Sequence, residues 1–107
     1  MEEIIGMLDA SLRDLQTDHV DVFQLHGPPP AFTDYALYEV IPAMLKEKAK
    51  GKFRHLGISE TAPGDVQHGL LAKAAQEGLI EVCMVAFHMM HQTARKTLFP
   101  VTREKGV

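Results

Sequence analysis

A histidine at the end of a short apolar run is the first candidate for chemistry in this sequence. Residues 20–26 read VDVFQLH, and three prolines follow at positions 28–30. Apolar side chains on both faces are typical of a strand buried on both sides of a parallel sheet. Proline has no N–H for the ladder, so the strand should end near His26. Sheets and barrels of the α/β type bind ligands at this carboxyl end, although a histidine there can also simply terminate the strand.

Two later strand-like runs are expected to bring further side chains to the same place. Successive side chains of a strand point to opposite faces. Ser59 ends the second run, and Met84 and His88 share one face of the third. If the apolar faces of all three strands pack on helices, His26, Ser59 and either Met84 or His88 point to the other side. The pattern therefore predicts one cluster built from three separated segments.

The remaining reactive side chains are assigned to structural positions. His88 and His91 are three residues apart, so a helix would bring them together near Cys83. Neither the paired-cysteine nor the two-histidine-plus-carboxylate spacing of zinc sites is present, so no metal site is assigned. Cys83 is expected to be a small core residue. The other assignments are packing for Met84, Met89 and Met90, and the surface or strand ends for His19, His55 and His68.

Helices and strands alternate along the chain, and this order must position the candidate residues. The expected elements are helices over residues 2–16, 41–49, 63–76 and 93–105, the last broken or restarted at Pro100, and strands over residues 20–26, 53–59 and 81–87. A turn or short helix precedes residue 41, because Pro42 would interrupt a helix begun at Thr33. The order α-β-α-β-α-β-α predicts an α/β fold with a parallel sheet. On this pattern, a doubly wound sheet and a segment of a barrel are both open.

Composition limits the classes of protein to consider. The chain has 107 residues with 14 acidic and 11 basic side chains, which gives a formal net charge of -3. That length suits one soluble domain or less. No apolar run approaches the ~18 residues of a membrane span, and no basic patch indicates nucleic acid. The acidic start is unlike a signal peptide, and the single cysteine fits a reducing compartment, so we expect a cytoplasmic protein.

Two motifs make the sequence resemble the aldo-keto reductase family. SLRDLQTDHVDVFQLH at 11–26 resembles the family's SL..L..DY.D....H segment, and GKFRHLGIS at 51–59 resembles its GK.R..G.S strand. MVAF at 84–87, followed by Ala94, Arg95 and FP at 99–100, is similar to the sixth-strand region of one bacterial-type branch.

The resemblance implies a partial (β/α)₈ TIM barrel. The family's barrel has about 250 residues, so residues 1–107 would form a partial aldo-keto reductase domain with strands four to six. The resemblance also implies that the catalytic aspartate, tyrosine and lysine come from earlier strands. The sites for the cofactor phosphates would come from the last two βα loops.

The resemblance further implies roles for four residues. His26 matches the catalytic histidine, and Ser59 matches the serine that hydrogen-bonds the nicotinamide carboxamide. Glu60 stands at a cofactor-binding position that is usually asparagine, and Met84 stands where many members have glutamine. NADPH or NADH is the implied cofactor, and a small-molecule carbonyl compound is the implied substrate. His26 would orient the carbonyl while a tyrosine outside this segment supplies the proton.

Two functions from different classes remain open at this point, and a third reading is an independently folding three-stranded βαβ module without a phosphate-binding loop of the GxGxxG type. The first is a segment of an NAD(P)H-dependent oxidoreductase that reduces aldehydes or ketones. The second is a non-catalytic relative that binds nucleotide or acts as a regulatory subunit. Under either reading we expect the 107-residue chain by itself to be inactive, because the proton-donating tyrosine and the phosphate sites are not among its residues.

Overall fold

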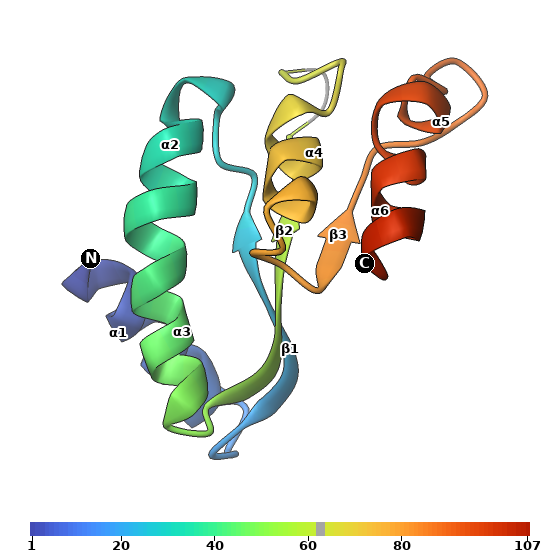
Figure 1. Ribbon diagram of the computed structural model, residues 1–107. Coiled ribbons are helices and arrows are strands. Elements are labelled where there is room, and N and C mark those ends of the chain that lie inside the picture. Colours follow the sequence, from blue (N-terminus) through green and yellow to red (C-terminus); the bar gives the residue numbers. More distant parts are fainter. Residues whose placement is uncertain (62–63) are drawn as a thin grey trace.

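Three parallel strands form the centre of the protein. The computed structural model describes residues 1–61 and 64–107. Strands β1 (Val20–His26), β2 (Phe53–Ser59) and β3 (Val82–Met84) lie in the order β1-β2-β3 in one sheet (Figure 1). Both pairings are parallel, so the three carboxyl ends meet at one edge. The predicted parallel sheet in sequence order is confirmed.

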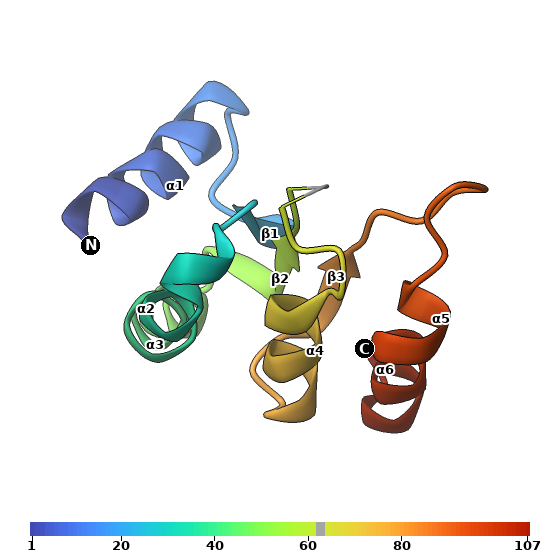
Figure 2. The ribbon, with the colours of Figure 1, turned by 90° about the horizontal axis from the view of Figure 1, so that it is seen from above.

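Helices connect the strands and cover one face of the sheet. Seen from above, the helices between and after the strands lie on one side of the sheet, and the first helix lies beyond β1 (Figure 2). Among the described residues, no helix has the length and apolar character needed to cross a membrane. The helical elements are α1 (Glu2–Asp14), η1 (Pro30–Phe32), α2 (Thr33–Tyr35), η2 (Ala36–Val40), α3 (Ile41–Ala49), α4 (Gly69–Gln76), α5 (Ala94–Thr97) and α6 (Phe99–Lys105).

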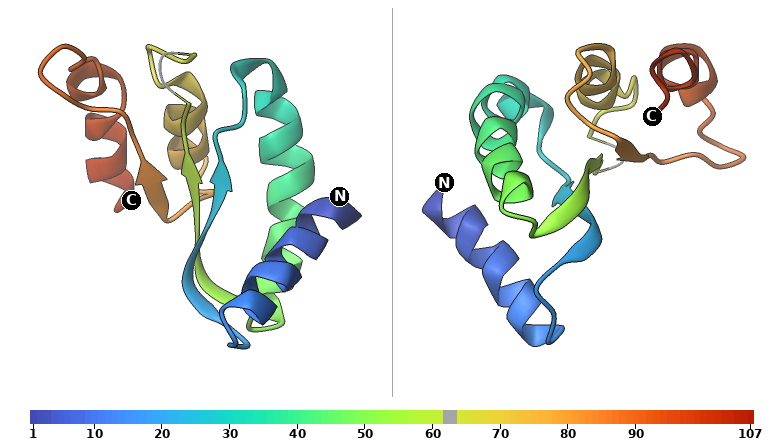
Figure 3. Two further views of the ribbon diagram at one scale, coloured as in Figure 1. Left: turned by 180° about the vertical axis from the view of Figure 1, so that it is seen from behind. Right: turned by 60° about the horizontal axis from the view of Figure 1, so that its bottom comes forward.

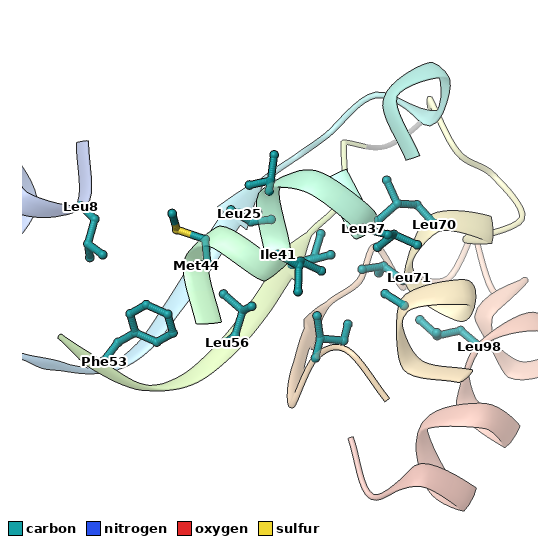
Figure 4. Packing of buried hydrophobic residues seen from close by; sticks show 14 of the residues in the cluster. Leu8, Leu25, Leu37, Ile41, Met44, Phe53, Leu56, Leu70, Leu71 and Leu98 are labelled. Atoms are coloured by element: carbon teal, nitrogen blue, oxygen red, sulfur yellow. The ribbon is translucent and has the colours of Figure 1, made fainter. Parts of the chain in front are cut away.

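The hydrophobic core lies between the sheet and these helices. Leu25, Leu56 and Ile58 leave β1 and β2 on the helix side and are buried. Burying one such side chain contributes about 1.5–3 kcal/mol, so this layer fixes which face of the sheet the helices cover. Figure 4 shows the cluster that they form with buried residues of the helices: Leu8, Leu37, Ile41, Met44, Leu70, Leu71 and Leu98.

The opposite face of the sheet carries apolar side chains without a covering layer. Val22 and Met84 are 41% and 58% exposed on that face. In the view from behind, no helix of the described residues lies across the three strands (Figure 3). An open apolar face of this kind is what a barrel interior presents when part of the barrel is taken alone.

Phe53 differs from its expected position. Alternation of faces predicts that it points away from the helices with Val22. Its side chain is instead 2% exposed within the core cluster, and its ring packs on Phe23 with centroids 5.4 Å apart. Leu8 of α1 and Met44 of α3 lie beside the start of β2 (Figure 4), so burial of the ring there outweighs strict alternation at the first residue of the strand.

The segment before Pro42 shows how a helix can begin early and still accommodate a proline. Helical backbone runs from α2 through α3, with a π-helical turn, η2, between them. The N–H of Ile41 donates to the carbonyl of Ala36, which is a bond five residues back. Pro42 has no backbone N–H to donate. Because the π-helical turn shifts the hydrogen bonds by one residue, it changes which carbonyl group would be left without a donor at the proline. The predicted helix from Ile41 is confirmed, and a helical segment precedes it.

Helix α4 begins later than the sequence predicts. The predicted start at residue 63 lies outside the described residues, and the observed helix begins at Gly69. His68 has a φ of 57°, in the left-handed region, so an α-helix cannot run through it. The carboxylate of Asp65 accepts hydrogen bonds from the N–H groups of Gly69 and Leu70, each 3.0 Å long. Val66, which would lie on the apolar face if a helix included it, is 48% exposed.

Strand β3 is shorter than the predicted run over residues 81–87. It ends at Met84, and among the described residues it pairs only with β2. The N–H of Ala86 donates to the carboxylate of Glu60 over 2.8 Å instead of continuing a ladder. A side chain from the end of β2 therefore terminates β3, which the pattern of residues in β3 could not reveal.

Candidate functional site

His26, Ser59 and Met84 form one row across the carboxyl edge of the sheet. His26 is the register partner of Ser59, and Ser59 is the partner of Met84. The imidazole of His26 is exposed, and the hydroxyl-bearing Ser59 is 7% exposed between its two neighbours. The structure brings together the three side chains that strand alternation places on one face. Their roles toward a cofactor or a substrate remain predictions.

The hydroxyl of Ser59 links the ends of β1 and β2. It accepts a hydrogen bond from the N–H of Gly27 over 3.1 Å. Its oxygen lies 3.4 Å from the Leu25 carbonyl and 3.5 Å from Nδ1 of His26. A hydroxyl has one donor and two acceptor positions, so one acceptor position remains free. When Ser59 donates to Nδ1, the ring proton of a neutral His26 sits on Nε2, which can donate to a carbonyl oxygen.

Gly27 permits the close approach of the two loops that follow β1 and β2. Its φ is +51°, which favours glycine. A Cβ built there would meet Oγ1 of Thr61 at 2.0 Å, while the Thr61 hydroxyl lies 3.3 Å from the Gly27 carbonyl. From the sequence, Gly27 is expected only to follow the end of the strand. Its second role, which is to leave room for Thr61, depends on the position of the loop after β2.

The carboxylate of Glu60 is already engaged within the protein. Its side chain is 6% exposed and lies 2.7 Å from Nδ1 of His68. The same carboxylate accepts the N–H of Ala86. Contact between Glu60 and a cofactor remains a prediction, and these partners favour an indirect role in which Glu60 holds His68 and Ala86 in place.

His68 corrects the surface position expected for it. Its side chain is 0% exposed, between Glu60 and His91. An isolated histidine in a polar stretch carries no pattern that predicts burial. Only the combination of Glu60 and His68 could have indicated that His68 is buried. A buried carboxylate needs a hydrogen-bond donor, and His68 is the first histidine after Glu60.

The spacing of His88 and His91 would bring them together on a helix, but the two residues do not lie on a helix. They pair across a tight turn, where each donates its backbone N–H to the other's carbonyl, over 3.1 and 3.0 Å. Met89 and Met90 form the tip of the turn and are 86% and 87% exposed. Met84 is also exposed, so the prediction that these three methionines are packing residues is wrong for residues 1–107.

An apolar cavity lies beside His26. Its volume is about 410 Å³, and its walls come from α1, β1 and residues 28–40, including Ile4, Phe23 and Phe32. Among the described residues β1 is paired with β2 alone, and α1 lies beyond its other side (Figure 2). The cavity therefore borders the free edge of the sheet, close to the end of the row.

Comparisons with known proteins agree on one family. The family model described as "Aldo/keto reductase family" matches residues 1–107. The chain is 31% identical over 107 residues to an L-galactose dehydrogenase of Arabidopsis thaliana, covering 99% of this chain and 33% of that protein. It is 26% identical over 108 residues to an NADH-specific methylglyoxal reductase of Escherichia coli, covering 99% of this chain and 31% of that protein.

A solved structure shows the same architecture. The crystal structure of an aldo/keto reductase from Klebsiella pneumoniae, in complex with NADP and acetate, superposes with a TM-score of 0.72 at 29% identity. The match covers 97% of this chain and 35% of that one. The three parallel strands with their helices are thus consistent with part of a TIM barrel, and the chain spans about a third of the length of the relatives that it matches. The chain belongs to the aldo/keto reductase family.

Proposed function

We propose that residues 1–107 form the central segment, strands four to six, of an NAD(P)H-dependent barrel that reduces aldehyde or ketone carbonyls. The observation that carries this proposal is the row His26–Ser59–Met84 at the carboxyl edge of three parallel strands. Barrels of this type bind their ligands at that edge. Both outer strands have a free edge among the described residues, so strands could be added on either side.

The residues around Ser59 fit a nicotinamide ring. Ser59 keeps one acceptor position for a carboxamide N–H, and the exposed Met84 offers a flexible apolar surface to the ring. Glu60 would act through His68 and Ala86, which its carboxylate holds in place. One relative is named as NADH-specific and the Klebsiella structure contains NADP, so the proposal covers both cofactors. When bound, the nicotinamide supplies the hydride equivalent for carbonyl reduction.

His26 is proposed to hold the carbonyl oxygen of the substrate. Negative charge develops on that oxygen during reduction, and a fixed donor stabilises it. Nε2–H can serve as this donor while Nδ1 contacts Ser59, which restrains the ring. The proton that completes the alcohol would come from an acid outside this chain.

Replacement of His26 in a barrel completed by the remaining strands tests the proposal. We expect His26→Ala to lower kcat/KM for simple aldehydes by roughly 30- to 900-fold, which is about 2–4 kcal/mol of barrier. The dissociation constant of the cofactor, measured by fluorescence titration, should stay close to that of the parent protein. His19→Ala is a matched control, because His19 precedes β1 at the opposite end of the sheet.

Assays of cofactor binding and of carbonyl reduction by the completed barrel distinguish a catalytic role from a non-catalytic binding role. A completed barrel that binds NAD(P)H and reduces no carbonyl compound would support the regulatory alternative. If His26→Ala abolished cofactor binding but left turnover by the cofactor-bound enzyme normal, the role assigned to His26 would be wrong.

A further inference from the structure

Two imidazoles are hydrogen-bonded to each other beside the end of the sheet, away from the row that contains His26. Nε2 of His68 and Nε2 of His91 are 3.2 Å apart. The ring centroids are 5.0 Å apart and the ring planes are inclined by 73°. His68 immediately precedes α4 and His91 lies in the turn after β3, so this imidazole pair joins two segments that are 23 residues apart.

Glu60 fixes which nitrogen of His68 faces His91. The Glu60 carboxylate lies 2.7 Å from Nδ1 of His68, so Nδ1 donates its proton to the carboxylate and Nε2 is directed at His91. The side chain of His68 is 0% exposed and that of Glu60 is 6% exposed, so packing holds this orientation. His91 is half-buried and His88, its partner across the turn, is exposed. The turn can therefore move away from His68 more easily than His68 can turn away from Glu60.

A hydrogen bond between two imidazole nitrogens needs a single proton between them. A neutral imidazole has one nitrogen that donates and one that accepts, whereas the cation donates from both nitrogens. With both rings neutral, or with one of them cationic, the imidazole pair keeps one donor and one acceptor at the facing nitrogens. When both rings are cationic, two N–H groups face each other and two positive charges lie 5.0 Å apart, so the contact becomes repulsive.

Neighbouring groups act on the imidazole pair in opposite directions. The carboxylate of Glu60, at the end of β2, favours the first added proton. The ring of His88 lies with its centroid 6.0 Å from that of His91, and it opposes the second added proton once it is itself charged. Three further titratable or charged side chains on the surrounding elements are engaged elsewhere or neutral: Asp65 accepts the first N–H groups of α4, Cys83 of β3 carries a neutral thiol, and Arg95 of α5 lies over the ring of Phe87.

We propose that the imidazole pair is a pH-sensitive latch on the turn of residues 88–91. The latch is closed while the facing nitrogens share one proton, and it opens when each nitrogen carries its own. Opening frees the turn from the start of α4, close to the carboxyl edge of the sheet, while Glu60 still accepts the N–H of Ala86. The latch requires no bound cofactor or substrate, so it does not depend on the proposed function.

Hydrogen–deuterium exchange of the purified chain tests the latch at about pH 7.5 and about pH 5.5, at one low protein concentration. These values span the ordinary titration range of imidazole, and both lie above the range near pH 4 in which carboxylates ordinarily take up protons. Mass spectrometry of peptides that cover residues 85–92 gives the protection of the turn, after correction with the chain unfolded in urea. Peptides from β1 and β2 are the internal reference for any loss of structure elsewhere.

Two variants assign the response to the imidazole pair. Nδ1 of His88 accepts the N–H of Met90 over 3.2 Å, so protonation of His88 is a second source of pH dependence in the turn. His88→Asn removes that source and serves as the matched control. The double variant His88→Asn/His91→Asn also replaces one ring of the pair by an amide, which does not titrate and offers His68 either a donor or an acceptor.

We expect the protection of residues 85–92 to fall by about three- to tenfold from the higher to the lower pH, both in the parent chain and in His88→Asn, which is the factor that one hydrogen bond contributes. The double variant should keep its protection unchanged. Constant protection in the parent chain or in His88→Asn would overturn the proposal. An equal fall in the double variant would also overturn it, because the response would then arise outside the imidazole pair.

Discussion

Cys83 shows how the position of one residue in the sheet sets its reactivity. It is the register partner of Ile58 and packs against the core on the helix side, as predicted. Burial, with a smaller contribution from the charge of Glu60, raises the pKa of the Cys83 thiol from 9.0 to about 11. Only the thiolate attacks alkylating reagents, so the side chain should react slowly in the folded chain.

Alkylation of Cys83 by iodoacetamide at mildly alkaline pH is expected to be about a hundredfold slower than that of an unperturbed thiol, because two pKa units lower the thiolate fraction by that factor. Unfolding in urea should restore the ordinary rate, and mass spectrometry follows both reactions. Because the chain has a single cysteine, the signal is unambiguous. Equal rates in the folded and unfolded chain would show that the thiol is not buried.

Among the elements, strand β2 fits between β1 and β3 because residue 57 is glycine. A Cβ on Gly57 would lie 2.8 Å from the Val82 carbonyl oxygen and 3.1 Å from Cγ of Gln24. The first of these contacts is backbone, which cannot move without displacing β3. We expect Gly57→Ala to destabilise the fold by about 1–3 kcal/mol through overpacking.

Gly6→Ala provides the matched control for this prediction. Gly6 lies within α1, and a Cβ there meets nothing within 4 Å. This substitution should stabilise the helix by about 0.5–1 kcal/mol, so the two variants should change the free energy of unfolding in opposite directions. Urea titrations at one protein concentration measure both. A neutral or stabilising effect of Gly57→Ala would mean that β3 does not pack as observed.

Ion pairs at the junction between α3 and β2 are expected to make the stability of the fold depend on pH. Glu47, near the end of α3, has a buried carboxylate 2.6 Å from the ammonium groups of Lys50 and Lys52. Hydrogen bonds from Lys50 and then from Lys52 hold the pKa of the Glu47 carboxyl below its usual value. Lys52 also pairs with Asp9 of α1, so the cluster joins three elements.

The lowered pKa fixes the direction of the pH effect. The folded chain binds a proton at Glu47 less tightly than the unfolded chain, so this contribution is present above the unfolded pKa near 4.5 and is lost as pH falls through the folded value. Glu47→Gln should be less stable than the parent at neutral pH and should lose less stability on acidification. Urea titrations from about pH 7 to about pH 3 test this. Parallel pH profiles of the two proteins would contradict it.

At the scale of the whole molecule, the sheet has two unpaired edges in the described part of the chain, at β1 and β3. The face away from the helices exposes Val22 and Met84, and the turn beyond β3 exposes Met89 and Met90. Open edges beside apolar surface favour association with further strands or with other copies. In a closed barrel the two edges would be paired, and Val22 and Met84 would face the interior.

We expect the purified 107-residue chain to self-associate and to show no carbonyl reduction. Size-exclusion chromatography over a range of concentrations measures the first property, and NAD(P)H consumption with simple aldehydes measures the second. A monomer with one cooperative unfolding transition would contradict the expected self-association. Cofactor-dependent turnover by the chain would show that its own residues supply the proton donor, contrary to the role proposed for an acid outside it.

Elements with local signals could be predicted from the amino-acid sequence. Prolines end β1 at His26, and glycines with positive φ at Gly51, Gly78 and Gly106 follow helices, as glycine commonly does. Strand alternation also placed His26, Ser59 and either Met84 or His88 on one face, and the pairing of β2 with β3 selected Met84. These predictions need only the residues within each element and the order of the elements.

Tertiary structure alone decided the features that depend on a distant partner. Glu60 ends β3 by accepting the N–H of Ala86, which is 26 residues away in the sequence, and the same carboxylate contacts the buried His68. Phe53 turns into the core because α1 and α3 leave apolar side chains beside it. In each case one residue gains a hydrogen bond or loses exposed apolar surface only when segments far apart in the chain meet, so no local pattern carries the information.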